Sequence, residues 1–294
     1  MLRQILASTM TFAGIMATFL FWYKIIPLDS KFLEWQRDPY NVWLTMAIWA
    51  VLGGISCLMA SRNIASWAMK VDLWDDQTDP DFQRAEAALQ RAQACLRLKK
   101  KPQLGLYERD EVNAFMIGLT LPRSTLALSR GALRHLSATD LEILITRELL
   151  HFKSGDVKAI ALMQGMIFAF TLYVARMLAF LLGTSLRQTE EEETPSHGVE
   201  ILVTSALVVL LTLPGALVFW AFSRSSALRA DAAAARVFGK PIYAAFLDHV
   251  AGHQVPKSEI FSDAFKLQSR PYPAWLAWLS LQPGLALRAR LLAS

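Results

Sequence analysis

One stretch of this sequence decides its fold: residues 147–156 read Arg147-Glu148-Leu149-Leu150-His151-Phe152-Lys153-Ser154-Gly155-Asp156. The stretch closes a segment that begins at Ser137, whose side chain can cap the first turn of a helix. Apolar residues occupy most sides of that helix, which predicts that it is buried. Two of its polar residues, Arg147 and His151, are one helical turn apart and share a face. This stretch, on a buried helix, is the one examined below for chemistry.

Short strands and one further helix are predicted before this stretch. Residues 80–98 are rich in Ala and charged residues with helical spacing, and Pro102 follows them. Residues 103–108 and 124–129 are typical of short strands, and residues 113–116 predict a turn with a third strand. The sequence therefore predicts a mainly α protein with a small β-sheet.

Four apolar stretches, residues 5–22, 42–60, 159–182 and 201–222, are long enough to cross a membrane as helices. Each has close to the roughly 20 residues that a hydrocarbon core of about 30 Å requires. Basic residues flank the same ends of these stretches: Arg3, Arg62, Lys70, Lys153, Lys158, Arg224 and Arg229. By the positive-inside rule these ends and both termini are cytoplasmic, while the acidic run at residues 190–193 falls in an outside loop.

The four stretches divide the chain into alternating membrane and cytoplasmic parts. We expect two transmembrane helices in residues 1–60, a cytoplasmic segment at 61–158, a transmembrane hairpin at 159–222 and a second cytoplasmic segment at 223–294. The two cytoplasmic segments together form one domain. The lipid bilayer is one partner, because 54% of the 294 residues are apolar. Nucleic acid is not expected, since the net charge of +5 is modest and no basic block alternates with aromatic residues.

The stretch at 147–156 resembles the metal-binding helix of the HtpX-type integral membrane zinc metalloproteases. In that family the helix carries H-E-x-x-H, in which both His bind zinc and the Glu polarises a zinc-bound water, and a Gly-Asp pair follows. Here Glu148, His151 and the Gly-Asp pair match, and Arg147 replaces the first His. Further matches are Asn113-Ala114-Phe115, Ser223-Arg224 and Arg229-Ala230-Asp231. The resemblance implies a zincin-like α+β cytoplasmic domain in a protein of the bacterial inner membrane.

The resemblance also implies a ligand set that this chain does not keep. The third zinc ligand of the family is a Glu four residues before Asp231, where this chain has Ala227. His151 is then the residual ligand position, Glu148 the residual general-base position, and Asn113, Arg224 and Asp231 supporting residues. A guanidinium about 4 Å from a divalent cation repels it by roughly 8 kcal/mol at an effective dielectric near 20. We therefore expect no zinc and no other cofactor.

Arg147 has two alternative interpretations. In the first it pairs with a carboxylate, such as Asp231, and this pair replaces the metal as the link between the two cytoplasmic segments. In the second it points to the surface. His249 and His253 are one turn apart, a spacing that metal ligands can have, but the helix predicted there is amphipathic and its His residues are expected to be solvated.

The sequence thus favours a pseudoprotease, a catalytically inactive relative of the HtpX-type enzymes. Such a protein would bind or regulate unfolded or membrane-protein polypeptides, or an active protease, in membrane protein quality control. The resemblance implies that polypeptide lies along a sheet edge, and residues 124–129 are the matching strand. Two alternatives stay open: an active zinc metalloendopeptidase with unusual ligands, and a structural membrane scaffold.

Overall fold

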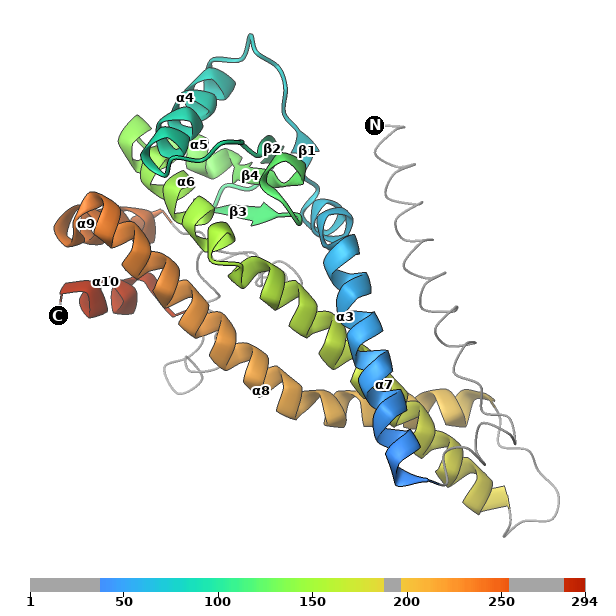
Figure 1. Ribbon diagram of the computed structural model, residues 1–294. Helices are drawn as coiled ribbons and strands as arrows, with labels where there is room; N and C mark the ends of the chain where they lie inside the picture. The colour runs from blue at the N-terminus through green and yellow to red at the C-terminus, as the bar shows by residue number, and fades with distance from the viewer. Residues whose placement is uncertain (1–37, 188–196, 254–282, 294) are drawn as a thin grey trace. The chain divides into compact units, whose positions relative to one another are not determined.

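The computed structural model describes residues 38–187, 197–253 and 283–293, and the chain forms two compact units (Figure 1). Unit 1 comprises Met1–Leu58 and Ala161–Phe219, and unit 2 comprises Met59–Ile160 and Trp220–Ser294. Each unit is built from two separate segments of the chain. The predicted span at residues 5–22 and the acidic run at 190–193 lie outside the described residues.

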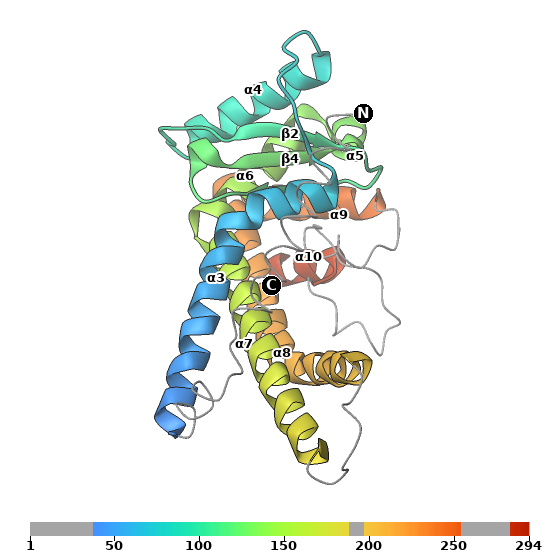
Figure 2. The ribbon, with the colours of Figure 1, turned by 90° about the vertical axis from the view of Figure 1, so that its right-hand side faces the viewer.

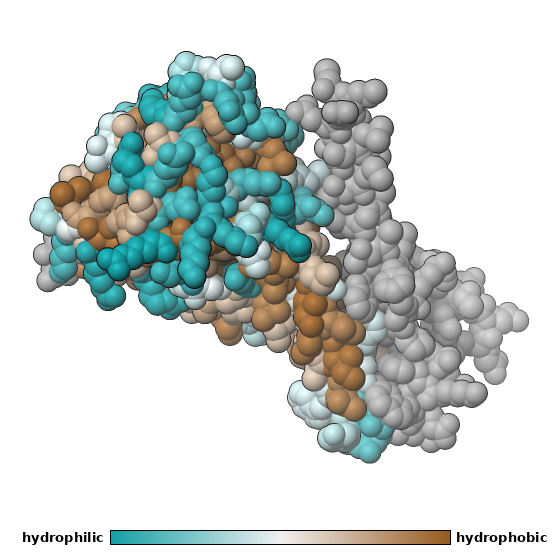
Figure 3. All heavy atoms as spheres, turned by 45° about the horizontal axis from the view of Figure 1, so that its top comes forward, coloured by the Kyte–Doolittle hydropathy of each residue, from teal (hydrophilic) through white to brown (hydrophobic). Residues whose placement is uncertain are grey.

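Unit 1 contains parts of three long helices, α3 (Pro39–Met69), α7 (Asp156–Arg187) and α8 (His197–Phe238). Tyr40–Met69 and Asp156–Ala175 are long and apolar enough to cross a membrane. Predicted spans two, three and four fall within these helices, and the total of four transmembrane helices remains a prediction. Figure 3 shows apolar side chains along the exposed part of the helical unit, as expected of surfaces that face lipid.

Glycines allow the helices of unit 1 to pack closely. A Cβ atom on Gly53 of α3 would lie 2.2 Å from the Cβ of Ala169 on α7. A Cβ on Gly215 of α8 would lie 2.7 Å from the Ile167 side chain of α7. Small residues at such contacts are typical of helices that pack within a membrane.

Unit 2 contains a four-stranded sheet of order β1-β2-β4-β3. The strands are β1 (Asp72–Leu73), β2 (Gln103–Tyr107), β3 (Ala114–Ile117) and β4 (Thr125–Ser129). β2 and β4 pair in parallel, whereas β3 pairs antiparallel with β4 and β1 with β2. The three predicted strands are confirmed. The expectation that residues 124–129 form a sheet edge is wrong, because β4 lies between β2 and β3, and β3 is the end strand among the described residues.

Helices cover both faces of this sheet. Leu104, Met116, Leu126 and Leu128 point to one face and join a core with α4 (Pro80–Cys95), α6 (Ala138–Lys153), α9 (Lys240–Gly252) and α10 (Leu285–Ala293). On the other face, Phe115, Ile117 and Ala127 pack against Ala65 and Met69 at the end of α3. Figure 2 shows β2 and β4 side by side, with α4 above them and the end of α3 below. The two sets of side chains point to opposite faces because successive residues of a strand alternate between the two faces of the sheet.

Two short helices lie next to β4. A 3-10 turn, η1 (Leu121–Arg123), precedes β4, and α5 (Arg130–His135) follows it directly. The Ser129 side chain caps α5 by accepting from the backbone N–H of Ala132 at 3.0 Å. α5 then leads through Ser137 into α6, the helix that carries the candidate site.

Candidate functional site

The candidate site is built on α6, which is buried as the sequence predicts. Ser137 caps the helix by accepting from the backbone N–H of Asp140. Leu141 and Ile143, which lie on roughly opposite sides of the helix, are both buried. Because α6 is held in the core on nearly all sides, its polar residues at 147 and 148 are held in the interior as well, each with only 2% of its surface exposed.

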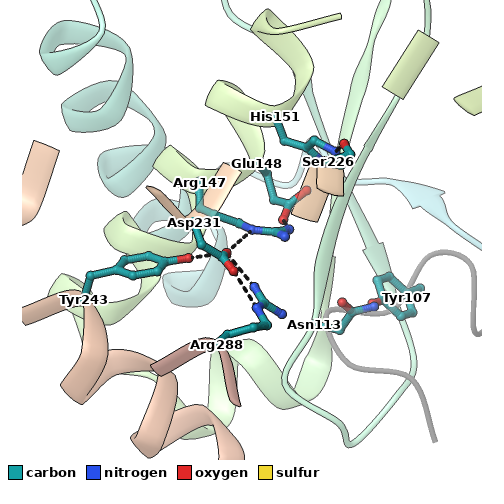
Figure 4. Close-up of polar contacts among 9 residues, drawn as sticks. All are labelled: Tyr107, Asn113, Arg147, Glu148, His151, Ser226, Asp231, Tyr243 and Arg288. Carbon is teal, nitrogen blue, oxygen red and sulfur yellow. Dashed lines mark hydrogen bonds and ion pairs between the residues drawn. The ribbon is translucent and has the colours of Figure 1, made fainter. Parts of the chain in front are cut away.

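Arg147 forms ion pairs with two carboxylates (Figure 4). Its Nη1 donates to the Glu148 carboxylate, and its Nε donates to Asp231 Oδ1 at 3.3 Å. Among the described residues its Nη2 has no hydrogen-bond partner. The predicted pair between Arg147 and Asp231 is therefore present, and the alternative that Arg147 points to the surface is wrong.

Asp231 is the centre of this cluster and lies on α8. Arg288 of α10 binds both of its oxygens, with Nε 2.5 Å from Oδ2 and Nη2 2.6 Å from Oδ1. The Tyr243 hydroxyl of α9 donates to Oδ1 at 2.8 Å. Asp231 thus connects α6, α8, α9 and α10, and a two-bond guanidinium–carboxylate contact is among the stronger polar contacts in proteins.

The charges of this buried cluster cancel, because two guanidiniums face two carboxylates. Burial alone would raise the pKa of Asp231, but the Arg288 and Arg147 guanidiniums outweigh it and hold that pKa below its usual value. Burial raises the pKa of Glu148, with Arg147 opposing the shift. Burial and the Asp231 charge both raise the pKa of Tyr243, so its hydroxyl keeps its proton and donates to Asp231.

His151 faces Ser226 rather than the ion pairs, with Nε2 2.8 Å from the Ser226 Oγ. Burial, followed by the Arg147 charge, lowers the pKa of His151 to about 3, so the ring is neutral at physiological pH. A Ser beside a His suggests a nucleophile and its base. Ser226 is fully buried, however, and a His with so low a pKa is a poor base near pH 7. This contact is structural.

The Gly-Asp pair ends α6 and starts α7. Gly155 has a φ of 84°, a left-handed conformation that glycine adopts without strain, and the chain turns there. Asp156 accepts from Arg229 of α8 at 3.0 Å. The Asp156–Arg229 ion pair is therefore a second link between the segment that carries the candidate site and α8, in addition to the pair between Arg147 and Asp231.

The structure separates the remaining predicted residues. The buried Asn113 donates from Nδ2 to the Tyr107 hydroxyl at 2.7 Å, on the strand side of the region in Figure 4. Arg224 lies over the Trp220 ring, 5.2 Å from its centre. Ala227 is buried, with 1% of its surface exposed, and offers no metal-binding atom.

The residues present at this place do not fit a zinc ion. At the ligand positions that the resemblance implies, Arg147 places a buried cation and Ala227 a methyl group, and Glu148 is already bound by Arg147. Across residues 38–187, 197–253 and 283–293, no three His, Cys, Asp or Glu side chains converge as metal ligands. A three-ligand site needs His, Cys or carboxylate donors, and only His151 supplies one at the implied ligand positions.

Sequence reasoning missed three residues of the cluster: Tyr243, Ser226 and Arg288. Arg288 had a usable signal. It lies on the same face of a short apolar helix as Leu285 and Ala289, which are both buried. An arginine on such a face needs a buried carboxylate, and Asp231 provides it.

Comparisons with known proteins agree with this architecture. Residues 79–290 match the sequence model of peptidase family M48. The chain is 32% identical to Protease HtpX of Tolumonas auensis over 230 residues, which are 77% of this chain and 78% of the relative. It is 25% identical to a Protease HtpX homolog of Methylacidiphilum infernorum over 99% of this chain and 98% of the relative.

Among solved structures, the fold is similar to that of Ste24p from S. mikatae. The TM-score is 0.56 and the sequence identity 15%. The match covers 98% of this chain but 63% of the Ste24p chain. At this identity the likeness concerns the fold alone.

Proposed function

The chain belongs to peptidase family M48, and we propose that it is an HtpX-type member that holds no catalytic zinc and cleaves no peptide bond. The observation that carries this proposal is the buried guanidinium of Arg147, paired with Glu148 and Asp231. The same helix position supplies the first zinc ligand in the resemblance described above. A metal and this guanidinium exclude one another at that place.

Energetics support the exclusion of zinc. At about 4 Å and an effective dielectric near 20, the repulsion between a divalent cation and a guanidinium is roughly 8 kcal/mol. Moving Arg147 away leaves Glu148 without its partner, and breaking a buried ion pair in this way costs about 3 to 5 kcal/mol. His151 alone gives little binding energy to offset these terms.

The site also offers no free groups for the hydrolysis of a peptide bond. A peptide carbonyl must be polarised, and a water must be activated by a base that is free to accept a proton. Glu148, the residual base, is bound by Arg147 and has 2% of its surface exposed. Neither Glu148 nor the neutral His151 is placed to supply both functions.

We further propose that the protein binds membrane-protein or unfolded polypeptides without cutting them and so acts in quality control at a bacterial inner membrane. Pairing along a sheet edge uses main-chain hydrogen bonds and needs no metal. β3 ends the sheet of the described residues and packs near α6. The basic flanks of the predicted spans favour a cytoplasmic position for unit 2 and both termini.

The first experiment measures metal and activity together on detergent-purified full-length protein. We expect no cleavage of an unfolded protein substrate and no zinc that depends on His151, tested with His151→Gln. The double variant Arg147→His, Ala227→Glu should take up about one further equivalent of zinc, because it restores the implied ligand set. Cleavage by the parent that disappears in Glu148→Gln would establish the alternative, an active enzyme with unusual ligands.

A crosslinking experiment separates polypeptide binding from a purely structural scaffold. A photoreactive residue at Leu119, which is 38% exposed and follows β3, should capture unfolded polypeptide. The matched control is the same residue at Leu73, which is 59% exposed on β1 at the other end of the sheet. Equal or absent capture at the two positions favours the scaffold.

A further inference from the structure

Basic residues gather where α7 begins and where α8 leaves its predicted span. Residues 149–160 and 220–230 are the two segments concerned, and both belong to unit 2. We call their four basic residues the basic layer: Lys153, Lys158, Arg224 and Arg229. The stretch Asp156–Ala175 is long and apolar enough to cross a membrane, and the predicted span within α8 ends at residue 222. The basic layer therefore lies at the end of one candidate span and one predicted span.

Carboxylates do not cancel the positive charge of the basic layer. Asp156 is the one acidic residue in the sequence of the two segments, and the carboxylates that flank the segments belong to the neutral buried cluster described above. The Oδ1 atom of Asp156 accepts from Arg229 Nη2 at 3.0 Å, which also holds the two segments in contact. Among the described residues, no carboxylate forms an ion pair with Lys158 or with the exposed Lys153. Four cations and one anion leave a net charge of +3.

Aromatic rings lie beside three cations of the basic layer. The distances from cation to ring centre are 5.3 Å for Lys158 and Phe152, 5.2 Å for Arg224 and Trp220, and 5.5 Å for Arg229 and Phe222. The face of a ring attracts a cation but, unlike a carboxylate, does not neutralise it. Aromatic rings and long basic side chains are both typical of the level at which the apolar part of a bilayer meets its headgroups. The contacts thus hold positive charge at the level of the lipid headgroups.

We propose that the basic layer binds the phosphate group of an anionic phospholipid, such as phosphatidylglycerol. Phosphate oxygens accept from guanidinium and ammonium groups, and clusters of these groups beside a membrane helix attract acidic lipids. A zwitterionic lipid such as phosphatidylcholine has the same phosphate but carries its own cation, so it gains less from the net positive charge. The inference goes beyond the proposed function, because a lipid bound at the helix ends requires neither a metal nor a polypeptide.

The test is a calorimetric titration of the detergent-purified full-length protein with phosphatidylglycerol and, separately, with phosphatidylcholine. One basic residue near a membrane surface contributes roughly a factor of five in affinity for acidic lipid. We therefore expect a Kd for phosphatidylglycerol that is lower than that for phosphatidylcholine by about fivefold or more. Lys158→Gln and Arg224→Gln should each raise the Kd for phosphatidylglycerol by about two- to fivefold and leave the Kd for phosphatidylcholine unchanged. Lys158→Arg, which keeps the charge, should retain the Kd of the parent.

Arg236→Gln is the matched control, because Arg236 is an exposed arginine on the same helix as Arg224. It lies about 18 Å further along α8, at a rise of about 1.5 Å per residue, and its replacement should alter neither Kd. Equal Kd values for the two lipids overturn the proposal. So does a rise in Arg236→Gln as large as that in Arg224→Gln, since it would reflect net charge alone.

Inorganic phosphate distinguishes the lipid from a free anion. Loss of the preference for phosphatidylglycerol when inorganic phosphate is present at the same concentration as the lipid would show that the basic layer binds free phosphate, and would overturn the lipid as its ligand. A preference that persists supports the lipid. Zinc content and cleavage are measured separately, so failure of this proposal leaves the proposed function intact.

Discussion

Replacing Arg147 by Met tests the buried ion pairs directly. Met is unbranched and of similar length, so Arg147→Met removes the charge and fills much of the space. Asp231 keeps Arg288 and Tyr243, whereas Glu148 loses the Arg147 Nη1 that binds it. The main cost of the variant is therefore an uncompensated Glu148 carboxylate.

The size of that cost has an upper limit, because Glu148 can take up a proton instead. Protonating a carboxyl with an ordinary pKa near 4.3 at pH 7.5 costs about 4 kcal/mol. This agrees with the loss of about 3 to 5 kcal/mol found when one partner of a buried pair is removed. For a unit of this size the loss lowers Tm on the order of 10 °C. The penalty should shrink as the pH is lowered, since protonation becomes easier.

Thermal unfolding of the detergent-purified full chain, followed by tryptophan fluorescence at pH 7.5, measures this loss. The matched control is Arg91→Met, because Arg91 pairs with Glu142 at 2.6 Å while its side chain is 47% exposed. Exposed pairs contribute at most about 1 kcal/mol, so this control should change Tm by only a few degrees. The double variant Arg147→Met, Glu148→Gln should recover most of the loss, because it removes both charges.

Two results would refute the reasoning. One is a Tm for Arg147→Met no lower than that of Arg91→Met. The other is a double variant that is as unstable as the single variant. Either result would mean that Arg147 contributes to stability through packing or not at all. It would then be wrong that the charge of Arg147 replaces a metal.

Three further changes test other contacts of the site. The pKa of His151 is about 3 in the folded chain, below its ordinary value of about 6.5. The unfolded chain therefore binds the proton more readily, and the free energy of unfolding falls as the pH drops below about 6.5. Between pH 7.5 and 5 we expect the free energy of unfolding to fall by about 1 to 2 kcal/mol because of His151, a value already reduced for the partial exposure of the ring. Measured as the difference in Tm between these two pH values, this contribution should be absent in His151→Gln. Gly155→Ala should destabilise by about 1 kcal/mol because of its positive φ, whereas Gly252→Ala, in open space at a helix end, should not lower Tm. Tyr243→Phe should cost about 2 kcal/mol, the value of a hydrogen bond to a charged group, and an unchanged Tm would show that Asp231 does not need it.

Local patterns predicted the elements around the site well. The cap at Ser137 and the apolar sides of α6 placed the helix and its burial, and alternation placed the three longer strands. Strand order was not predictable, because nothing local in residues 124–129 shows that β3 turns back to pair with β4. The edge assignment failed for that reason.

The site itself was predicted only where a resemblance supplied the partner. Asp231 came from a matched motif, and its pair with Arg147 followed from the need to neutralise a buried charge. Arg288 and Tyr243 reach Asp231 from 57 and 12 residues away, through helices whose packing no short pattern encodes.

The separation of Arg147 and Asp231 implies an order of assembly. The pair joins residues 84 positions apart, and the chain between them runs through α7 and α8. Closing a free loop of this length carries an entropic cost. α7 and α8 contact each other at Ile167 and Gly215, so their association brings the chain back on itself before the pair forms. The contact between α7 and α8 should therefore form first and the ion pairs last, and a newly made chain in which these two helices have not yet associated should present α6 with its charges still open to water.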